Sequence, residues 1–186
     1  MTPRLVVLTD RTQLCSGRGL VSTVAACVDA GLTHVVLREL DLSTATRARL
    51  VKALARLEGL TVWSAHAWLP GASGVHVSAR GEPPRAGVWG RSCHSRAEVD
   101  AAAGEGASWA TLSPYAASAS KPGDRRLREP GEYAGHRIPV LALGGITPVN
   151  AAAAVAAGAH GVAVMGAVMA APDPAAVVGR LLEVVS

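Results

Sequence analysis

Residues 140–166 read VLALGGITPVNAAAAVAAGAHGVAVMG and contain a complete strand–helix–strand pattern. A short apolar run ends in Gly144 and Gly145, an alanine-rich segment of helical character follows, and a second apolar run ends in Met165 and Gly166. Two strands joined in this way lie parallel in one sheet, because the helix returns the chain to the edge at which the first strand began. This unit therefore predicts a parallel sheet.

The same alternation extends along the whole chain. Apolar runs rich in β-forming residues predict strands at 5–10, 34–39, 60–65, 74–78, 88–93, 109–113, 139–145 and 161–166. Helical patterns occupy 20–31, 43–57, 95–106, 147–158 and 173–185. Eight strands without a second domain predict an α/β fold, a single (β/α)8 TIM barrel over residues 1–186. Only HAWLPGA and ARGEPPRAG follow the third and fourth strands, so helices three and four are expected to be shortened or missing.

Local signals mark where several of these helices begin. Ser95 with Glu98 fits a capping box. The pairs Thr147-Pro148 and Asp173-Pro174 each place a cap residue before a first-turn proline. We therefore expect helices to start at these three places.

The composition is that of an ordinary globular protein. A net charge of +4 comes from arginines scattered along the chain, with no basic run interleaved with aromatics, which argues against nucleic-acid binding. The apolar core of the N-terminus is too short for a signal peptide, and no run approaches the length of a membrane span. Cys15, Cys27 and Cys93 are odd in number and widely spaced, which predicts reduced thiols rather than a disulfide framework or a zinc site. We expect a cytoplasmic protein with no membrane partner.

The glycines that end the last two strands predict a phosphate site. In TIM barrels the active site lies at the carboxyl ends of the strands, and phosphates often bind the loops after strands seven and eight. At Gly144, Gly145 and Gly166 an anionic oxygen can approach bare backbone N–H groups beside a helix N-terminus. The other interpretation is that these glycines only make tight turns, and both can hold.

The segment SPYAASASKPGDRR (residues 113–126) follows the sixth strand and is too polar to be other than a loop. Its hydroxyls at Ser118 and Ser120 precede Lys121, which with Lys52 makes up the lysines among 18 basic residues. An ammonium in a hydroxyl-rich loop suits the capture of an anionic group. A plain solvated loop is the alternative.

In this order and spacing, VVLREL, GVHVS, GRSCHS, SASKPG and LALGGITPVNAAAAVAAGAHGVAVMGAV resemble the thiamine-phosphate synthase/TenI family of small TIM barrels. The resemblance implies one of two activities. Synthases join a hydroxymethylpyrimidine diphosphate, held with Mg²⁺, to thiazole phosphate, whereas TenI-type tautomerases aromatise a thiazole carboxylate phosphate by proton transfer. Both bind thiazole phosphate through backbone amides after strands seven and eight, which the resemblance places at Gly145, Met165 and Gly166. It also matches Lys121 to a lysine of the strand-six loop.

The resemblance is incomplete where synthases bind the diphosphate. Their motif Gln-x-Arg-x-Lys corresponds to Val36, Arg38 and Leu40, so only the arginine is kept. The stretches WSAHAW and HVSARGEP lack the family's magnesium-binding carboxylates until Glu82. A charge-assisted hydrogen bond contributes about 1.5–3 kcal/mol, so these losses together argue against synthase activity. Ser92 does match the active-site serine of the synthases.

Tautomerisation needs neither metal nor diphosphate, but it needs a proton shuttle, for which histidine is suited near neutral pH. The family's shuttle histidine corresponds to Pro114 here, so a replacement must come from another strand end. His66 and His94 lie at the predicted opening of the barrel, and with Ser92 they are the candidate catalytic residues; a structural role in a turn is the alternative for His94. His76 lies deeper, where packing in the barrel interior competes with substrate binding.

Three functions remain open: a TenI-like thiazole tautomerase, a divergent thiamine-phosphate synthase, and a non-catalytic regulator that binds a related phosphate. The residues at the strand-two motif and the missing carboxylates favour the first and the third function over the second. They do not separate the first from the third, and we place the tautomerase first. The expected ligand is a thiazole phosphate, no metal is expected unless the synthase alternative requires Mg²⁺, and the resemblance suggests a homodimer. The predicted substrate-binding residues are Arg38, His76, Ser118, Ser120, Lys121, Gly144, Gly145, Met165 and Gly166.

Overall fold

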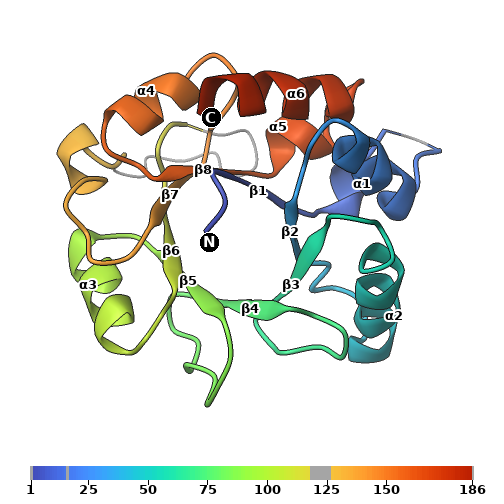
Figure 1. Cartoon of the computed structure of the whole chain (residues 1–186), viewed down its shortest axis with the longest axis horizontal. Coiled ribbons are helices and arrows are strands. Elements are labelled where there is room, and N and C mark those ends of the chain that lie inside the picture. The colour runs from blue at the N-terminus through green and yellow to red at the C-terminus, as the bar shows by residue number, and fades with distance from the viewer. Residues whose placement is uncertain (1, 16, 118–126, 186) are drawn as a thin grey trace.

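Eight parallel strands follow one another around a closed barrel, with helices on its outside (Figure 1). The computed structural model describes residues 2–15, 17–117 and 127–185. β1 pairs with both β2 and β8, which closes the sheet without a free edge. The chain therefore has the predicted (β/α)8 architecture. The strands are β1 (Leu5–Leu8), β2 (His34–Leu37), β3 (Thr61–Ala65), β4 (Gly74–Val77), β5 (Trp89–Cys93), β6 (Trp109–Leu112), β7 (Val140–Leu143) and β8 (Gly161–Val164).

The helices of the described residues lie mostly between the strands, as the alternation predicts. In that part of the chain none is long and apolar enough to cross a membrane. α6 starts at the expected pair, with the Asp173 carboxylate accepting the Ala176 N–H at 3.0 Å. The helices are η1 (Arg11–Gln13), α1 (Leu20–Asp29), α2 (Thr44–Leu54), α3 (Arg96–Gly104), η2 (Pro130–Glu132), α4 (Ala151–Ala156), α5 (Gly166–Met169) and α6 (Pro174–Val185), where η marks a short 3-10 helix.

The helix between β7 and β8 begins later than the Thr147-Pro148 pair predicts. α4 starts only at Ala151. The Asn150 side chain accepts the Thr147 N–H at 2.8 Å and donates to the Gly145 carbonyl at 2.9 Å. Asparagine readily replaces helix hydrogen bonds with such local ones, so the segment stays a turn up to Asn150. This turn fixes the chain just beyond the two glycines.

No helix covers the outside of β4, as the short connections predict (Figure 1). Residues 66–73 and 78–88 form loops instead. Leu69 from the first loop is buried in the core, and the exposed Trp68 ring lies so close to Gly87 that a Cβ there would approach it to 2.4 Å. The two loops thus pack on each other in place of helices.

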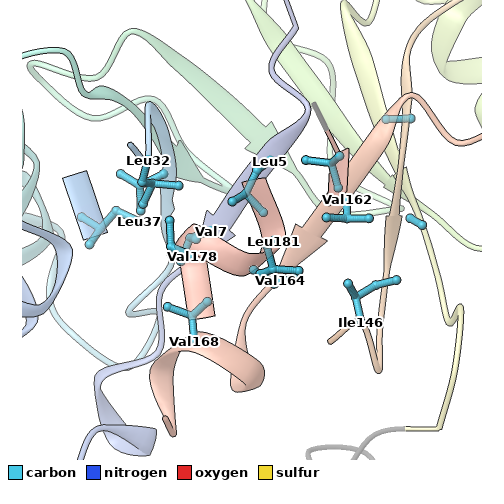
Figure 2. Close-up of a cluster of buried hydrophobic side chains, with 14 of the residues drawn as sticks. Leu5, Val7, Leu32, Leu37, Ile146, Val162, Val164, Val168, Val178 and Leu181 are labelled. Atoms are coloured by element: carbon cyan, nitrogen blue, oxygen red, sulfur yellow. The ribbon is translucent and has the colours of Figure 1, made fainter. Parts of the chain in front are cut away.

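The outer faces of β1 and β8 pack against the C-terminal helices (Figure 2). Burying a valine or leucine side chain stabilises a fold by about 1.5–3 kcal/mol, so this contact anchors both strands firmly. The loop after β8 therefore starts from a rigid position. The buried side chains drawn here include Leu5, Val7, Val162, Val164, Val168, Val178 and Leu181.

Large aromatic side chains fill the barrel interior. The Trp63 and Trp109 rings stack with centroids 4.6 Å apart, and the His76 ring also stacks on the Trp109 ring, with centroids 4.8 Å apart. The indoles fit because the facing residues are glycines: a Cβ on Gly74 would lie 2.7 Å from the Trp63 ring, and one on Gly90 would lie 2.2 Å from the Trp109 ring. Since the interior is occupied, any ligand must bind above it.

All three cysteines are free thiols, as predicted. Burial raises the pKa of Cys27 to about 11 and that of Cys93 to about 12. These two thiols stay protonated at neutral pH and pack as small apolar groups, whereas Cys15 is exposed.

Candidate active site

The inner face of the barrel leads to an opening at the carboxyl ends of the strands, which we call the mouth. Side chains alternate between the two faces of a strand, so Arg38 is the next inward position after the interior residue Val36. By the same alternation Ser92 follows Gly90, and Met165 follows Ala163. The predicted site residues Arg38, Ser92 and Met165 therefore lie at the mouth.

The loops after β7 and β8 present backbone N–H groups that are free to bind a ligand. Gly145 and Ile146 follow β7, and Gly166 and Ala167 open α5. Within the described residues, none of these four N–H groups donates a hydrogen bond. Unpaired N–H groups after two neighbouring strands suit a phosphate.

Gly145 is confined by its own backbone and by the connection that follows β6. Its φ is +64°, a conformation that favours glycine, and a Cβ there would lie 2.4 Å from the Ala117 carbonyl oxygen. The connection is held over the turn by two backbone bonds, from the Tyr115 N–H to Leu143 and from the Ala116 N–H to Gly144, both 2.9 Å long. The tight-turn interpretation of these glycines therefore applies, and it leaves the N–H groups available.

Arg38 projects from the end of β2 toward the end of β8. Its backbone N–H donates to the Thr9 hydroxyl at 3.0 Å, and its guanidinium Nη1 lies 2.9 Å from the Met165 sulfur. A thioether is a weak acceptor. Arg38 is half-buried, and among the described residues it forms no ion pair. A cation without a carboxylate partner beside the β8 turn suits an anionic ligand.

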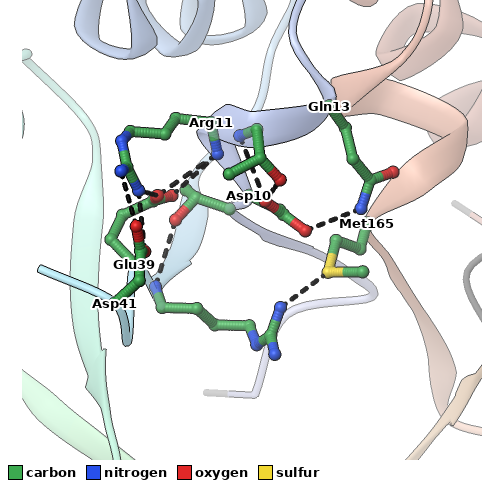
Figure 3. A network of polar contacts seen from close by, with 9 residues as sticks. Asp10, Arg11, Gln13, Glu39, Asp41 and Met165 are labelled. Atoms are coloured by element: carbon green, nitrogen blue, oxygen red, sulfur yellow. Dashed lines mark hydrogen bonds and ion pairs between the residues drawn. The ribbon is translucent and has the colours of Figure 1, made fainter.

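A network that the sequence analysis did not identify braces the backbone around Arg38 (Figure 3). The buried Glu39 carboxylate accepts the backbone N–H of Arg11 at 3.1 Å and its Nη1 at 3.1 Å. Arg11 also makes a bidentate bond to Asp41 with distances of 2.7 and 2.5 Å. The bond to Asp41 first, and then that to Glu39, raises the pKa of Arg11. Glu39 itself has a φ of +35°, a rare conformation that this network sustains.

His66 lies exposed just beyond β3, close to the cations of the mouth. Its φ is +66°, which breaks the strand alternation, and its backbone N–H donates to the His76 carbonyl at 2.9 Å. Burial, and then the nearby charges of Arg38 and Arg47, lowers the pKa of His66 below its usual value. The imidazole is therefore neutral near pH 7 and able to accept a proton.

His76 is enclosed in the barrel interior. It is 4% exposed, and its Nε2 lies 3.4 Å from the Thr111 hydroxyl. Burial lowers the pKa of His76 to about 3, so the ring stays neutral. This position agrees with the packing interpretation of His76 and does not present the ring to a ligand.

His94 and Ser113 form a pair at the ends of neighbouring strands. The imidazole Nδ1 lies 3.1 Å from the Ser113 hydroxyl and 3.1 Å from the Ser113 carbonyl oxygen. The His94 backbone N–H donates to the Glu98 carboxylate at 2.7 Å, which holds the turn before α3. His94 thus has the expected structural role and also contacts a hydroxyl at the mouth. Only the pairing of β5 with β6 reveals this contact, because the residues are far apart in sequence.

Three predicted residues belong to the loop after β6, and one further carboxylate, Asp10, follows β1. Ser118, Ser120 and Lys121 lie outside the described residues. Asp10 is bound locally: although partial burial opposes ionisation, hydrogen bonds from Thr12 and Gln13 keep its pKa below the usual range. Within the described part of the chain no three His, Cys, Asp or Glu side chains come together as a metal site.

Comparisons with known proteins cover nearly the whole barrel. Residues 64–168 match the family model described as thiamine monophosphate synthase. A putative thiamine-phosphate synthase of Geobacter sulfurreducens is 34% identical, over 91% of this chain and 88% of its own. The thiamine-phosphate synthase of Moorella thermoacetica is 31% identical, over 97% and 94%. A thiamine phosphate pyrophosphorylase from Pyrococcus furiosus has the same fold, with a TM-score of 0.85 and 24% identity over 98% and 95% of the two chains.

Proposed function

The chain belongs to the thiamine monophosphate synthase family, and from this premise we propose that it joins a pyrimidine diphosphate to a thiazole phosphate. The observation that carries the proposal is the likeness, over almost the full chain, to relatives named thiamine-phosphate synthase. The product of the reaction is thiamine phosphate.

The sequence-based preference for a TenI-like tautomerase finds no support in these comparisons. The relatives reported above are named synthases or pyrophosphorylases. The synthase alternative is therefore the better supported of the two activities, although Val36 and Leu40 stand where synthases have glutamine and lysine.

The mouth has groups that suit the anionic part of each of the two substrates. The N–H groups of Gly145 and Gly166 support binding of the thiazole phosphate, since they follow the neighbouring strands β7 and β8 and donate to no described residue. Arg38 supports binding of the diphosphate, because among the described residues its guanidinium has only the Met165 sulfur as a partner. Ser92 and Ser113 offer hydroxyls that can orient the rings between the two anionic groups.

The test is a turnover assay on the purified chain with hydroxymethylpyrimidine diphosphate, thiazole phosphate and Mg²⁺. We expect thiamine phosphate to form, and Arg38→Met to reduce the rate at least tenfold because a charge-assisted contact of about 1.5–3 kcal/mol is lost. The matched control is Arg180→Met, on the exposed side of α6. A folded protein that binds thiazole phosphate but forms no product would refute the synthase proposal.

One observation keeps tautomerisation as a second candidate. The His94–Ser113 pair lies beside Pro114, the position at which the family resemblance places the shuttle histidine. If the chain turns over the thiazole carboxylate tautomer, His66→Ala should lower the rate of tautomerisation and leave the affinity for thiazole phosphate unchanged. If His66→Ala leaves the rate unchanged and His94→Gln lowers it, the proton shuttle is His94. Inactivity in both assays with retained phosphate binding would indicate the non-catalytic alternative.

A further inference from the structure

We propose that Glu39 is a positioning residue, which through Arg11 joins the end of β2 to the η1 turn and thereby sets where the Arg38 guanidinium lies. This inference rests on the proposed synthase function, in which Arg38 contacts the diphosphate. It is drawn from the buried contact between Glu39 and Arg11, from the backbone conformation of Glu39, and from the charges that η1 places around Arg38 (Figure 3).

Glu39 holds Arg11 both by its backbone and by its side chain. The Arg11 backbone N–H lies 3.1 and 3.2 Å from the two carboxylate oxygens of Glu39, and the Arg11 Nη1 donates to the same carboxylate at 3.1 Å. The Glu39 side chain is only 1% exposed, so water does not compete for these bonds. Charge-assisted hydrogen bonds away from water are stronger than those of an exposed ion pair. Glu39 therefore fixes the start of η1 against the end of β2.

Arg11 has a second carboxylate partner, Asp41, in a different environment. The two bonds to Asp41 are 2.7 and 2.5 Å long, but the Asp41 side chain is 56% exposed. Ion pairs of this kind contribute little, because water and salt screen them. One arginine thus binds two carboxylates, of which the buried one, Glu39, also binds the Arg11 backbone. Asp41 is the matched control for Glu39.

The backbone of Glu39 adjoins Arg38 and has a left-handed conformation. Its φ is +35°, which residues other than glycine rarely adopt. This angle sets the orientation of the peptide between Arg38 and Glu39 relative to the Glu39 side chain, which Arg11 anchors. On the other side, the Arg38 N–H donates to the Thr9 hydroxyl at 3.0 Å. Without the contact to Arg11 the angle can relax, and the Arg38 peptide then turns away from its present orientation.

The η1 turn also determines which charges surround the Arg38 guanidinium. Asp10 is the N-cap of η1, and its carboxylate accepts the Thr12 hydroxyl at 2.6 Å and the Gln13 amide at 2.8 Å. It lies close enough to Arg38 for the two charges to attract each other. A shift of η1 would change the distance between Asp10 and Arg38, and with it the attraction of Arg38 for an anionic ligand.

Calorimetric titration with inorganic pyrophosphate, with Mg²⁺ present throughout, tests the inference without turnover. Glu39→Gln keeps the shape of the side chain but removes its charge, and we expect it to weaken pyrophosphate binding about 10-fold. Asp41→Asn should change the affinity by less than about threefold, because the bond that it weakens is exposed. Arg38→Met should weaken binding at least as much as Glu39→Gln, which shows that pyrophosphate reports on Arg38. Thiazole phosphate should bind Glu39→Gln with unchanged affinity, since its site follows β7 and β8.

A variant that is destabilised far from the mouth separates positioning from stability. Val178 is fully buried on α6, outside the barrel, so Val178→Ala should lower the Tm by leaving a cavity. We expect it to bind pyrophosphate as the unaltered chain does. Arg11→Lys, which keeps a cation opposite Glu39, should weaken binding less than Arg11→Met. If Glu39 only stabilised the fold, pyrophosphate affinity would instead fall with the Tm in every variant.

Turnover distinguishes this inference from the proposed function. Weaker pyrophosphate binding in Glu39→Gln but not in Val178→Ala, with a raised KM for the pyrimidine diphosphate and an unchanged KM for thiazole phosphate, supports both. The same binding result, with no thiamine phosphate formed by the unaltered chain, supports the positioning role and refutes the synthase function. The inference is overturned, even for an active synthase, if Glu39→Gln binds pyrophosphate normally, if it loses thiazole phosphate affinity equally, or if the unaltered chain binds no pyrophosphate.

Discussion

At the scale of single residues, Gly145 determines both the shape of the β7 turn and access to its N–H groups. Its φ of +64° disfavours any other residue, and the Ala117 carbonyl stands where a Cβ would go. Gly145→Ala should therefore destabilise the protein by about 1–3 kcal/mol and weaken thiazole phosphate binding. Chemical denaturation and calorimetry measure the two effects.

Gly179 provides the matched control for this change. It lies within α6, and a Cβ there meets nothing within 4 Å. Gly179→Ala should stabilise the chain by about 0.5–1 kcal/mol, as alanine does in a helix. Unchanged phosphate affinity in Gly145→Ala would contradict the phosphate site.

The sequence identifies residues of this kind because their signal is local. Two glycines at the end of an apolar run mark a turn without knowledge of the rest of the chain. The Arg11 network could not be found in this way, since its partners are 28 and 30 residues away and meet only when β1 pairs with β2. The left-handed turn at His66 was also missed, because strand alternation assumes extended backbone.

At the scale of elements, the packing between β5 and β6 depends on a small residue, Gly90, that lies beside a large one, Trp109. Gly90→Ala would press a methyl group against the Trp109 ring, 2.2 Å away, and should cost about 1–3 kcal/mol. Trp109→Leu opens space at the same place, so the double variant should be more stable than the sum of the single changes indicates. Equilibrium unfolding of the four proteins gives the coupling energy, and strict additivity would count against the contact.

Element positions were easier to predict than element ends. Each predicted strand contains an observed one, because apolar runs of this length are suited to burial on both faces. The ends differ: α4 starts four residues after Thr147, since the Asn150 side chain competes for the same backbone groups. Side-chain competition of this sort depends on geometry that a pattern of residue types does not contain.

At the scale of the whole molecule, buried histidines make stability depend on pH. The pKa of His76 is about 3 in the folded chain against 6.5 for the free side chain, because of burial. The unfolded state therefore binds the extra proton first, and this stability is present above pH 6.5 and lost as the pH falls toward 3. The slope approaches about 1.4 kcal/mol per pH unit for this group.

His76→Gln should reduce that slope, because glutamine does not titrate. Urea unfolding of both proteins between pH 7 and pH 4 measures the difference. Identical slopes would show that His76 is protonated in the folded protein or that its ring is accessible to water.

The stacked indoles of the barrel interior also give the molecule an intrinsic optical probe. Three of the four tryptophans are buried, and only Trp68 is exposed, at 44%. In Trp68→Phe the remaining fluorescence comes from shielded indoles, two of which form the stack below the mouth. A ligand bound on that stack should change the tryptophan emission, so ligand binding can be followed by the intrinsic fluorescence of the unlabelled protein.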